Sequence, residues 1–574
     1  MQLAHFIGEL KRRRVFRVLA GYGIVAFAVL QIVEPIIHAL HLSDSTLGYV
    51  VLALGLGFPL AVVLAWAFDV NDGRVERTPA LNVPHRTPLL TLVLVGIGLA
   101  TAAPGITYYF FLRKPVVAAS IAVLPFVNMS ASPENEYFSD GISEELINAF
   151  ATIPGLRVAS RTSAFAFKGK SVSVQQIGTE LNVGAVVEGS IRREGTSLRI
   201  TAQLIDTSNG YHLWSASYDR ELKNIFAVEE ELARSIVHAL KSRLVPSEAT
   251  KVVRPATADV AAHDLFLKGR YFWNKRNLDS LKRAIAYFQQ AIDLDPSYAV
   301  AYAGLADSTA LLHEYGSASL AEVAPRARQA ALKALQLDGT LAEAHDTLGV
   351  IYQYEYEWAA AEQESRRAIE LEPRYPTAHH RFALLLYSIG RTTEAVAEAE
   401  TAVKLDPTSL AINNILTVSL YMNREYDRAL EQVRRTLELD PGYPLAHVNF
   451  AKALLAQGHF AEALDHLERA GPLKYPDRYG GDLAYAYAKS GRRNDALRVL
   501  RELDQRARRE GITLAPARAI ASLGLGDIDR TFAWLDKAYE ERDVALREIK
   551  CDPVYDAIRT DPRFARLLTQ LKLK

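Results

Sequence analysis

The chain has 574 residues, too many for one hydrophobic core, which predicts several domains. Lysine plus arginine and aspartate plus glutamate number 66 each, so no global basic field favours nucleic acid as a partner. The single cysteine, Cys551, excludes an intrachain disulfide and a thiolate metal site built from two cysteines.

The first 115 residues are much more apolar than the rest, and three stretches in them have the length of membrane spans. This part, 1–115, is predicted to hold transmembrane helices over about 15–40, 47–68 and 89–112. A cleaved signal peptide is the alternative for the first stretch, although its apolar run exceeds the usual length. Basic residues precede the first stretch and lie between the second and third. Because such charges favour the cytoplasmic side, we expect a bacterial inner-membrane protein with a cytoplasmic N-terminus and periplasmic C-terminal domains.

Residues 118–246 are expected to form a small α/β domain. Apolar runs predict strands at 121–126 and 156–160, and helical periodicity predicts helices at 142–151 and 172–181. Three alternating segments predict an antiparallel meander, with turns at Gly195 and Gly210. These segments are 185–193, 197–206 and 211–220, and a closing helix is expected over 226–244.

The loop after the first of these strands raises the question of a phosphate site. A phosphate cradle needs glycines that let backbone amides approach the ligand. The loop 128–136 has no glycine and carries the carboxylates of Glu134 and Glu136. We therefore expect no bound phosphate, with Ser139 and Asp140 capping the following helix and Gly141 acting as a turn residue.

Three segments of this domain carry a family resemblance. They are "SIAVLPFVNMSASPENEYFSDGISEELINAF", "ELNVGAVVEGSIRREGTSLRITAQLIDTSNGYHLWSASYDREL" and "IFAVEEELARSIVHAL". Together they resemble the domain related to the amino-terminal part of TolB and to FlgO. The resemblance implies a non-catalytic α/β unit of the cell envelope that carries no cofactor. In some relatives a cytoplasmic cyclase, kinase or DNA-binding domain precedes the membrane part. Only about fourteen residues precede the first apolar stretch here, so no such effector is expected.

The remainder of the chain is helical and repetitive. Small residues recur every 34 positions, and a proline recurs at the same interval. The first series is Ala327, Ala361, Ala395, Ala429 and Ala463, and the prolines are Pro373, Pro407 and Pro441. This period is typical of tetratricopeptide (TPR) repeats, in which small residues let paired helices pack closely. The chain resembles that family over 263–540, with seven or eight repeats, after a linker at 247–262 and before a capping segment at 541–574.

No motif for catalysis, a metal or a cofactor stands out. His263 and the pair His379 and His380 lack a second ligand set at helical spacing, so we predict no metal site. The run of acidic residues from Glu229 to Glu231 is expected to be a charged helix face rather than an acid–base pair. No catalytic residue is assigned, and the chain is predicted not to be an enzyme.

A peptide-binding groove is predicted on the first helix of each repeat. Residues 34 positions apart stack into stripes there, and two stripes have suitable chemistry. Polar side chains can hydrogen-bond a peptide main chain, and tyrosines offer rigid contact area. The predicted peptide-binding residues are Asp346, His380 and Asn414 in one stripe and Tyr387 and Tyr421 in the other. The alternative is that these are ordinary solvent-facing residues.

The expected fold is thus mainly α, with N-terminal transmembrane helices, a small α/β domain with antiparallel strands and a C-terminal α-solenoid of TPR helix pairs. The expected function is that of a non-catalytic, membrane-anchored scaffold whose periplasmic solenoid binds envelope proteins or peptides. The alternative is a membrane-coupled sensory subunit that passes a periplasmic signal to a separate cytoplasmic enzyme or transcription regulator.

Overall fold

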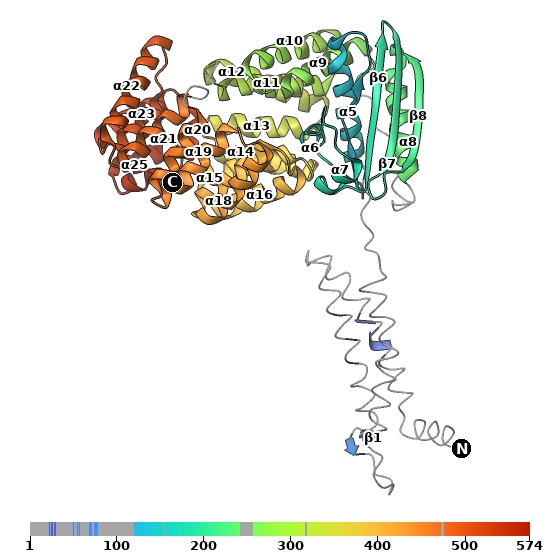
Figure 1. The fold of residues 1–574 in the computed structure, drawn as a ribbon, viewed down its shortest axis with the longest axis horizontal. Helices are drawn as coiled ribbons and strands as arrows, with labels where there is room; N and C mark the ends of the chain where they lie inside the picture. The colour runs from blue at the N-terminus through green and yellow to red at the C-terminus, as the bar shows by residue number, and fades with distance from the viewer. Residues whose placement is uncertain are drawn as a thin grey trace. The chain divides into compact units, whose positions relative to one another are not determined.

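A computed structural model describes residues 120–240 except 154, residues 256–471 except 316 and 317, residues 476–573, and short pieces between 22 and 77. The chain forms two compact units, Met1–Val117 and Ala118–Lys574. The second unit holds a sheet followed by a long series of helices (Figure 1).

The structure corrects the prediction of membrane spans. Within the described parts of the chain, no helix combines the length and the apolar character needed to cross a membrane. Phe68, the last residue of the second expected span, lies in strand β1 (Phe68–Asn71), which pairs antiparallel with β2 (Arg74–Arg77). An apolar run is necessary for a span, but a continuous helix of about 20 residues is needed too. The prediction of transmembrane helices, and of an inner-membrane protein with periplasmic C-terminal domains, is wrong on this finding. Most of 15–40 and 47–68, and all of 89–112, lie outside the described residues.

The α/β part is built on a mixed sheet with strand order β5-β3-β6-β7-β8, and β4 also pairs with β6. Strands β6, β7 and β8 form an antiparallel meander, whereas β3, β4 and β5 add to it in parallel. The bounds are β3 (Ser120–Val123), β4 (Val127–Asn128), β5 (Arg157–Val158), β6 (Ala185–Glu194), β7 (Ser197–Asp206) and β8 (His212–Glu221).

Helices cover both faces of this sheet. Ile121 and Val187 pack in one core with helices α5 (Glu136–Ala151) and α8 (Ile225–Leu240). Their chain neighbours Ala122 and Val186 pack in a separate core with α7 (Val174–Glu180). This is the period of two that a strand imposes on its side chains. The short helix α6 (Arg161–Phe165) follows β5.

Helix α5 begins earlier than the sequence predicts. It follows the 3-10 turn η2 (Pro133–Asn135), which Ser132 caps by accepting a hydrogen bond from the Glu134 amide. Ser139 and Asp140, the predicted helix caps, instead lie buried inside α5. Lys168 pairs with the Asp140 carboxylate at 2.5 Å, and this pairing compensates the burial of the acid. The capping prediction is therefore wrong, because α5 starts at Glu136 and both residues lie inside the helix.

Gly141 permits a close helix contact rather than a turn. A Cβ added at Gly141 would lie 2.9 Å from Cδ2 of Leu267, which belongs to helix α9 (Val260–Asn274). The absent side chain thus lets α9 approach α5, and Leu267 joins the core of the α/β part.

Replacing Gly141 by alanine is expected to destabilise the protein by about 1 kcal/mol. Overpacking costs about 1–3 kcal/mol, and the higher helix propensity of alanine offsets about 1 kcal/mol. Chemical unfolding of Gly141→Ala checks this. In a Leu267→Ala background, where the obstructing side chain is gone, the same substitution should be neutral or stabilising. An equal loss in both backgrounds would contradict the contact.

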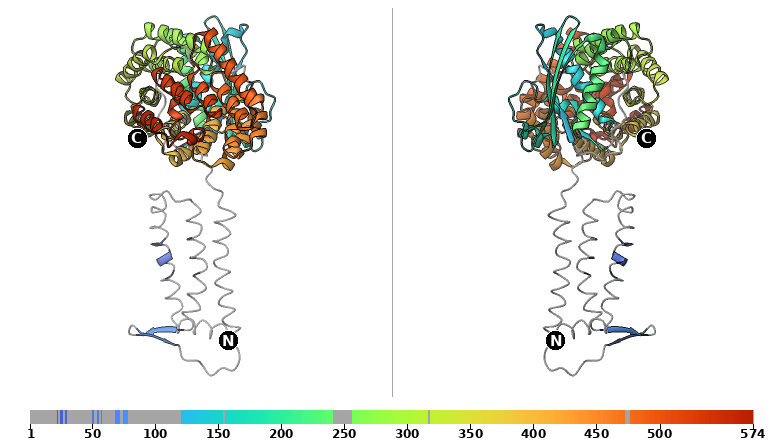
Figure 2. Two further views of the ribbon diagram at one scale, coloured as in Figure 1. Left: turned by 90° about the vertical axis from the view of Figure 1, so that its left-hand side faces the viewer. Right: turned by 90° about the vertical axis from the view of Figure 1, so that its right-hand side faces the viewer.

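Eight helix pairs follow in the described part of the chain. Figure 2 shows that they form a curved series. The recurring small residues lie where the paired helices meet: Ala327, Ala361, Ala395, Ala429 and Ala463 are all fully buried. The helices are α9 with α10 (Leu278–Leu294), α11 (Ala299–Glu314) with α12 (Leu320–Leu337), α13 (Ala342–Tyr354) with α14 (Trp358–Leu371), α15 (Pro376–Ile389) with α16 (Thr392–Leu405), α17 (Leu410–Met422) with α18 (Tyr426–Leu439), α19 (Pro444–Ala456) with α20 (Phe460–Ala470), α21 (Pro476–Lys489) with α22 (Arg493–Glu510), and α23 (Ala515–Gly524) with α24 (Ile528–Glu540).

The chain ends in a segment made of η5 (Val544–Glu548), η6 (Pro553–Ile558) and α25 (Pro562–Gln570), here called the C-terminal segment. Its apolar side chains, among them Leu546, Ile558 and Phe564, share a core with helices α23 and α24. The same core includes Tyr356, which lies between α13 and α14, so the C-terminal segment also reaches back to the middle of the solenoid.

Candidate functional site

The helix pairs enclose a central cavity of about 2850 Å³. The first helix of every pair contributes lining residues, whereas the second helices contribute residues at or near their ends or none at all. Helices α5, α6 and α8 of the α/β part and the stretch Glu540–Tyr555 contribute further lining residues. Small-molecule sites have volumes of about 300–1,000 Å³. This cavity is therefore large enough for a peptide segment.

Of the five predicted peptide-binding residues, three line the cavity and two are buried away from it. His380, Tyr387 and Asn414 line the cavity. Asp346 is 1% exposed and Tyr421 is 4% exposed, and neither is among the lining residues. Asp346 pairs with Arg381 at 2.6 Å, and the Tyr421 hydroxyl donates to Asp552 Oδ1 at 2.8 Å.

Arg381 is the centre of a polar network in the cavity wall. Its guanidinium donates to Asp307 and to Asp346, each at 2.6 Å, and Asp307 also accepts from the Trp273 indole at 2.7 Å. These contacts join α9, α11, α13 and α15. Burial raises the pKa of Asp346 to about 6, against the lowering effect of the Arg381 charge.

His380 sits next to this network in an electropositive environment. Burial lowers its pKa to about 3, and the guanidiniums of Arg381, Arg276 and Arg547 act in the same direction. The imidazole is therefore neutral over the physiological pH range, and it offers a hydrogen-bond donor and an acceptor to the cavity rather than a charge.

Arg276 brings a cation into the cavity and has no ion-pair partner among the described residues. It follows α9 in a left-handed conformation with φ of 49°, and its guanidinium stacks 3.7 Å above the Trp273 ring. Among the residues that the structure describes, no carboxylate lies within ion-pairing distance of it. Although its side chain is exposed to the cavity, desolvation by the surrounding wall lowers its pKa, and Asp307, whose charge opposes this lowering, is already paired with Arg381. Arg276 is thus a candidate anchor for an anionic group.

The C-terminal segment occupies part of the cavity wall. Arg547 makes two hydrogen bonds to Glu314, at 2.8 and 3.1 Å, and the Lys550 ammonium donates to the Ile389 carbonyl at 3.0 Å. Asp552 pairs with Lys452 at 3.0 Å and accepts from Tyr421. The segment therefore contacts α11, α15, α17 and α19 in addition to the last helix pair.

The α/β part closes the other side of the cavity through Glu144 of α5. Its carboxylate, 5% exposed, forms ion pairs with Arg161 at 2.7 Å and with Arg270 at 2.6 Å, and it accepts a hydrogen bond from Asn274 at 3.0 Å. These charges lower the pKa of Glu144 despite its burial. A buried charge held by two guanidiniums fixes the α/β part on the first helix pair.

Sequence reasoning missed Arg276, Arg381 and Glu144. Arg381 had a usable signal, since it stands at the start of the otherwise apolar stretch "RFALLLY" of a predicted first helix. No sequence signal pointed to Arg276, because the direction of its side chain depends on its own left-handed backbone conformation after α9. The partners of Glu144 are more than 100 residues away along the chain in two of three cases, so no local spacing reveals them.

Segments of the helical part match known protein families. Residues 420–481, and residues 273–298 with 376–409, match families described as tetratricopeptide repeat. The solenoid carries TPR repeats. The TPR solenoid is thus confirmed, and TPR architectures of this kind support protein–protein interaction.

Two similar solved structures are also TPR proteins. The first is YrrB, described as a TPR protein with an unusual peptide-binding site. It is 22% identical over 33% of this chain and 92% of its own, with a TM-score of 0.25. The second is TTC0263, a thermophilic TPR protein of Thermus thermophilus. It is 20% identical over 34% of this chain and 100% of its own, with a TM-score of 0.30.

One curated relative comes from Rhizobium meliloti (strain 1021) and is named "Putative adenylate cyclase 3". It is 38% identical over 233 residues, which make up 40% of this chain and 40% of that protein. The chain therefore spans less than half of the length of this relative.

Proposed function

We propose that the chain is a non-catalytic scaffold that binds a peptide segment of a partner protein inside the cavity of its TPR solenoid. His380, Tyr387 and Asn414 are the proposed contacts from the repeat stripes, and no cofactor is required. The TPR repeats support a protein or peptide partner, and the cavity volume supports a segment rather than a small molecule.

Arg276 carries the proposal further, because it sets the chemistry of the ligand. A guanidinium that faces the cavity, with no carboxylate partner in the described part of the chain, suits an acidic side chain or a C-terminal carboxylate. Neutral His380 nearby adds hydrogen bonding without a competing charge. The partner segment is therefore acidic at the point where it meets α9.

Replacing Arg276 by glutamine is expected to weaken binding of an acidic peptide about tenfold or more, because a charge-assisted hydrogen bond contributes about 1.5–3 kcal/mol. The full chain is first screened against a peptide array, and the tightest peptides are titrated by fluorescence anisotropy. Arg435→Gln, an exposed arginine on α18, is the matched control and should leave the affinity unchanged. Equal affinity for the wild type and Arg276→Gln, or an array without acidic preference, would place the binding surface elsewhere.

A second candidate function is that of a regulatory subunit or module acting on a separate enzyme. The observation that favours it is the 38% identity to a protein whose name includes adenylate cyclase. The resemblance of residues 118–246 to the TolB amino-terminal-like domain fits either role, as a non-catalytic unit. Under this proposal peptide or ligand capture in the cavity would change the activity of a cyclase added in trans, whereas a pure scaffold would leave it unchanged.

A further inference from the structure

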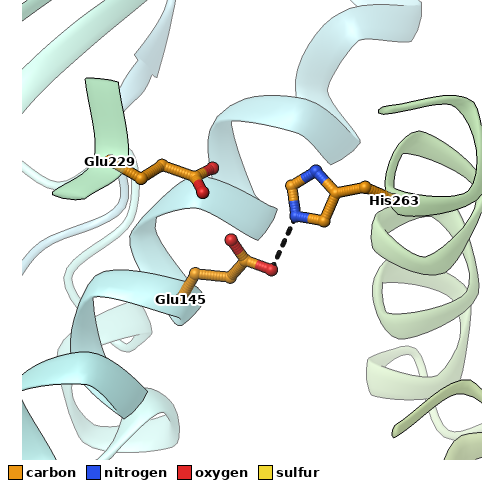
Figure 3. A group of neighbouring side chains, drawn as sticks. All are labelled: Glu145, Glu229 and His263. Carbon is orange, nitrogen blue, oxygen red and sulfur yellow. Dashed lines mark hydrogen bonds and ion pairs between the residues drawn. The ribbon is translucent and has the colours of Figure 1, made fainter. Parts of the chain in front are cut away.

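Three side chains from separate helices converge where the α/β part meets the solenoid. Glu145 lies on α5, Glu229 on α8 and His263 on α9, and one possible ligand atom from each lies within 4.8 Å of the other two (Figure 3). His263 is 3% exposed, and its Nε2 lies 2.8 Å from Glu145 Oε1. The three residues also line the central cavity, so an ion has a route to them.

The two carboxylates of this cluster lie close together. In Figure 3 the side chains of Glu145 and Glu229 extend into a shared space, and the imidazole of His263 faces them from the opposite side. The Oε1 atom of Glu229 is buried and has no hydrogen-bond partner within the described parts of the chain. Two facing carboxylates repel each other unless a proton or a cation lies between them.

We propose that Glu145, Glu229 and His263 bind a divalent transition-metal ion. Two carboxylate oxygens and one imidazole nitrogen are ligands that Zn²⁺ and similar ions accept, and a fourth position can be filled from the cavity by water or by a ligand. With metal–ligand bonds of about 2.0–2.2 Å, ligand atoms lie roughly 3.3–3.5 Å apart in a tetrahedral site. The 2.8 Å between His263 Nε2 and Glu145 Oε1 is shorter than this spacing and the 4.8 Å limit of the cluster is longer, so metal binding requires side-chain shifts of roughly 1 Å in both directions.

A metal ion at this position would link the α/β part to the solenoid. The ion would bond to α5 and α8 of the α/β part and to α9, the first helix of the solenoid. His263 is already oriented by packing against Phe226, with ring centroids 4.9 Å apart. Metal binding would thus fasten the two parts of this unit at a point separate from the Glu144 contacts.

The competing explanation is that Glu145 and Glu229 share a proton and bind no metal. The two explanations differ when metal is added. A proton-sharing pair gains nothing from Zn²⁺, whereas a metal site gains stability in proportion to the logarithm of the free ion concentration over its dissociation constant.

The test uses the full chain, freed of metal with a chelator and titrated with Zn²⁺ by calorimetry. Because the chain contains 14 histidines, adventitious binding is removed by comparing variants. Glu229→Gln and His263→Gln are expected to lose one equivalent of Zn²⁺ or to bind it at least tenfold more weakly. Glu231→Gln, two residues along the same helix and paired with Arg220, is the matched control and should bind as the wild type does.

Spectroscopy and melting separate loss of the site from loss of the fold. Co²⁺ should give visible ligand-field absorption in the wild type and in Glu231→Gln that is absent in Glu229→Gln. Zn²⁺ should raise the melting temperature of the first two proteins only. Metal-free Glu229→Gln should melt no lower than the metal-free wild type, because it removes one of two facing carboxylates. Unchanged Zn²⁺ binding in Glu229→Gln, or no binding by the wild type, would overturn the proposal.

Discussion

Replacing Glu144 by glutamine is expected to lower the free energy of unfolding of the 118–574 unit by about 3–5 kcal/mol, the usual cost of breaking a buried ion pair from one side. Glu144 pairs with the charges of Arg161 and Arg270 and accepts a hydrogen bond from Asn274. Glutamine keeps the shape but leaves the two guanidiniums partly buried without their counter-charge. Arg270 retains only a longer contact to Glu343 at 3.2 Å.

Denaturant unfolding of the full chain measures this loss. Glu431→Gln, whose carboxylate is exposed on α18 and pairs with Arg435, is the control and should change stability by less than about 1 kcal/mol. The Glu144 effect should also depend on pH. Its folded pKa is lowered, so its stabilising contribution is present above the unfolded pKa and is lost as the pH falls through the folded pKa. A loss in Glu144→Gln no larger than that of the control would mean that the α/β part does not depend on this contact.

Acidification to about pH 5 lowers the free energy of unfolding of the wild type. Replacing His380 by glutamine is expected to make that loss smaller by about 2 kcal/mol. The unfolded chain binds a proton at this residue near its ordinary pKa of about 6.5, whereas the folded pKa is about 3. Between these values protonation favours the unfolded state, so the wild type loses stability as the pH falls below about 6.5. The variant lacks this loss.

The measurement is the difference in unfolding free energy between about pH 7.5 and pH 5 for both proteins. Asp346, whose pKa is about 6, titrates in the same range, but it is present in both proteins and cancels in the comparison. At higher pH the two stability curves should run parallel. Curves that stay parallel throughout the acid range would show that His380 takes up a proton in the folded state and that its surroundings are not electropositive.

The repeats could be predicted from the sequence because they are a local property. The 34-residue recurrence of Ala361, Ala395 and Ala429 follows from the close packing of neighbouring helices, and all three are fully buried. The meander was equally accessible, since strand 197–206 pairs with its sequence neighbours on both sides.

The site was less predictable because its residues meet across long distances in the sequence. Tyr421 has the spacing of a groove residue, yet its hydroxyl is engaged by Asp552, 131 residues later. The cluster of Glu145, Glu229 and His263 has no helical spacing at all, because each residue comes from a different helix. For the apolar N-terminal stretches the sequence predicted too much. Their composition predicted membrane spans, but no described helix is long and apolar enough to cross a membrane.

The C-terminal segment changes how the solenoid responds to stress. In an open array of repeats each unit contacts only its neighbours, so the ends can fray and unfolding can spread one repeat at a time. Here Glu314 pairs with Arg547, 233 residues later, and the Trp358 indole donates to the Leu571 carbonyl, 213 residues later. These bonds join the last residues of the chain to its early repeats, so that loosening an inner repeat also breaks contacts at the end. The nearest-neighbour stack thereby acquires the high contact order of a globular domain, with slower folding and a more nearly all-or-none transition.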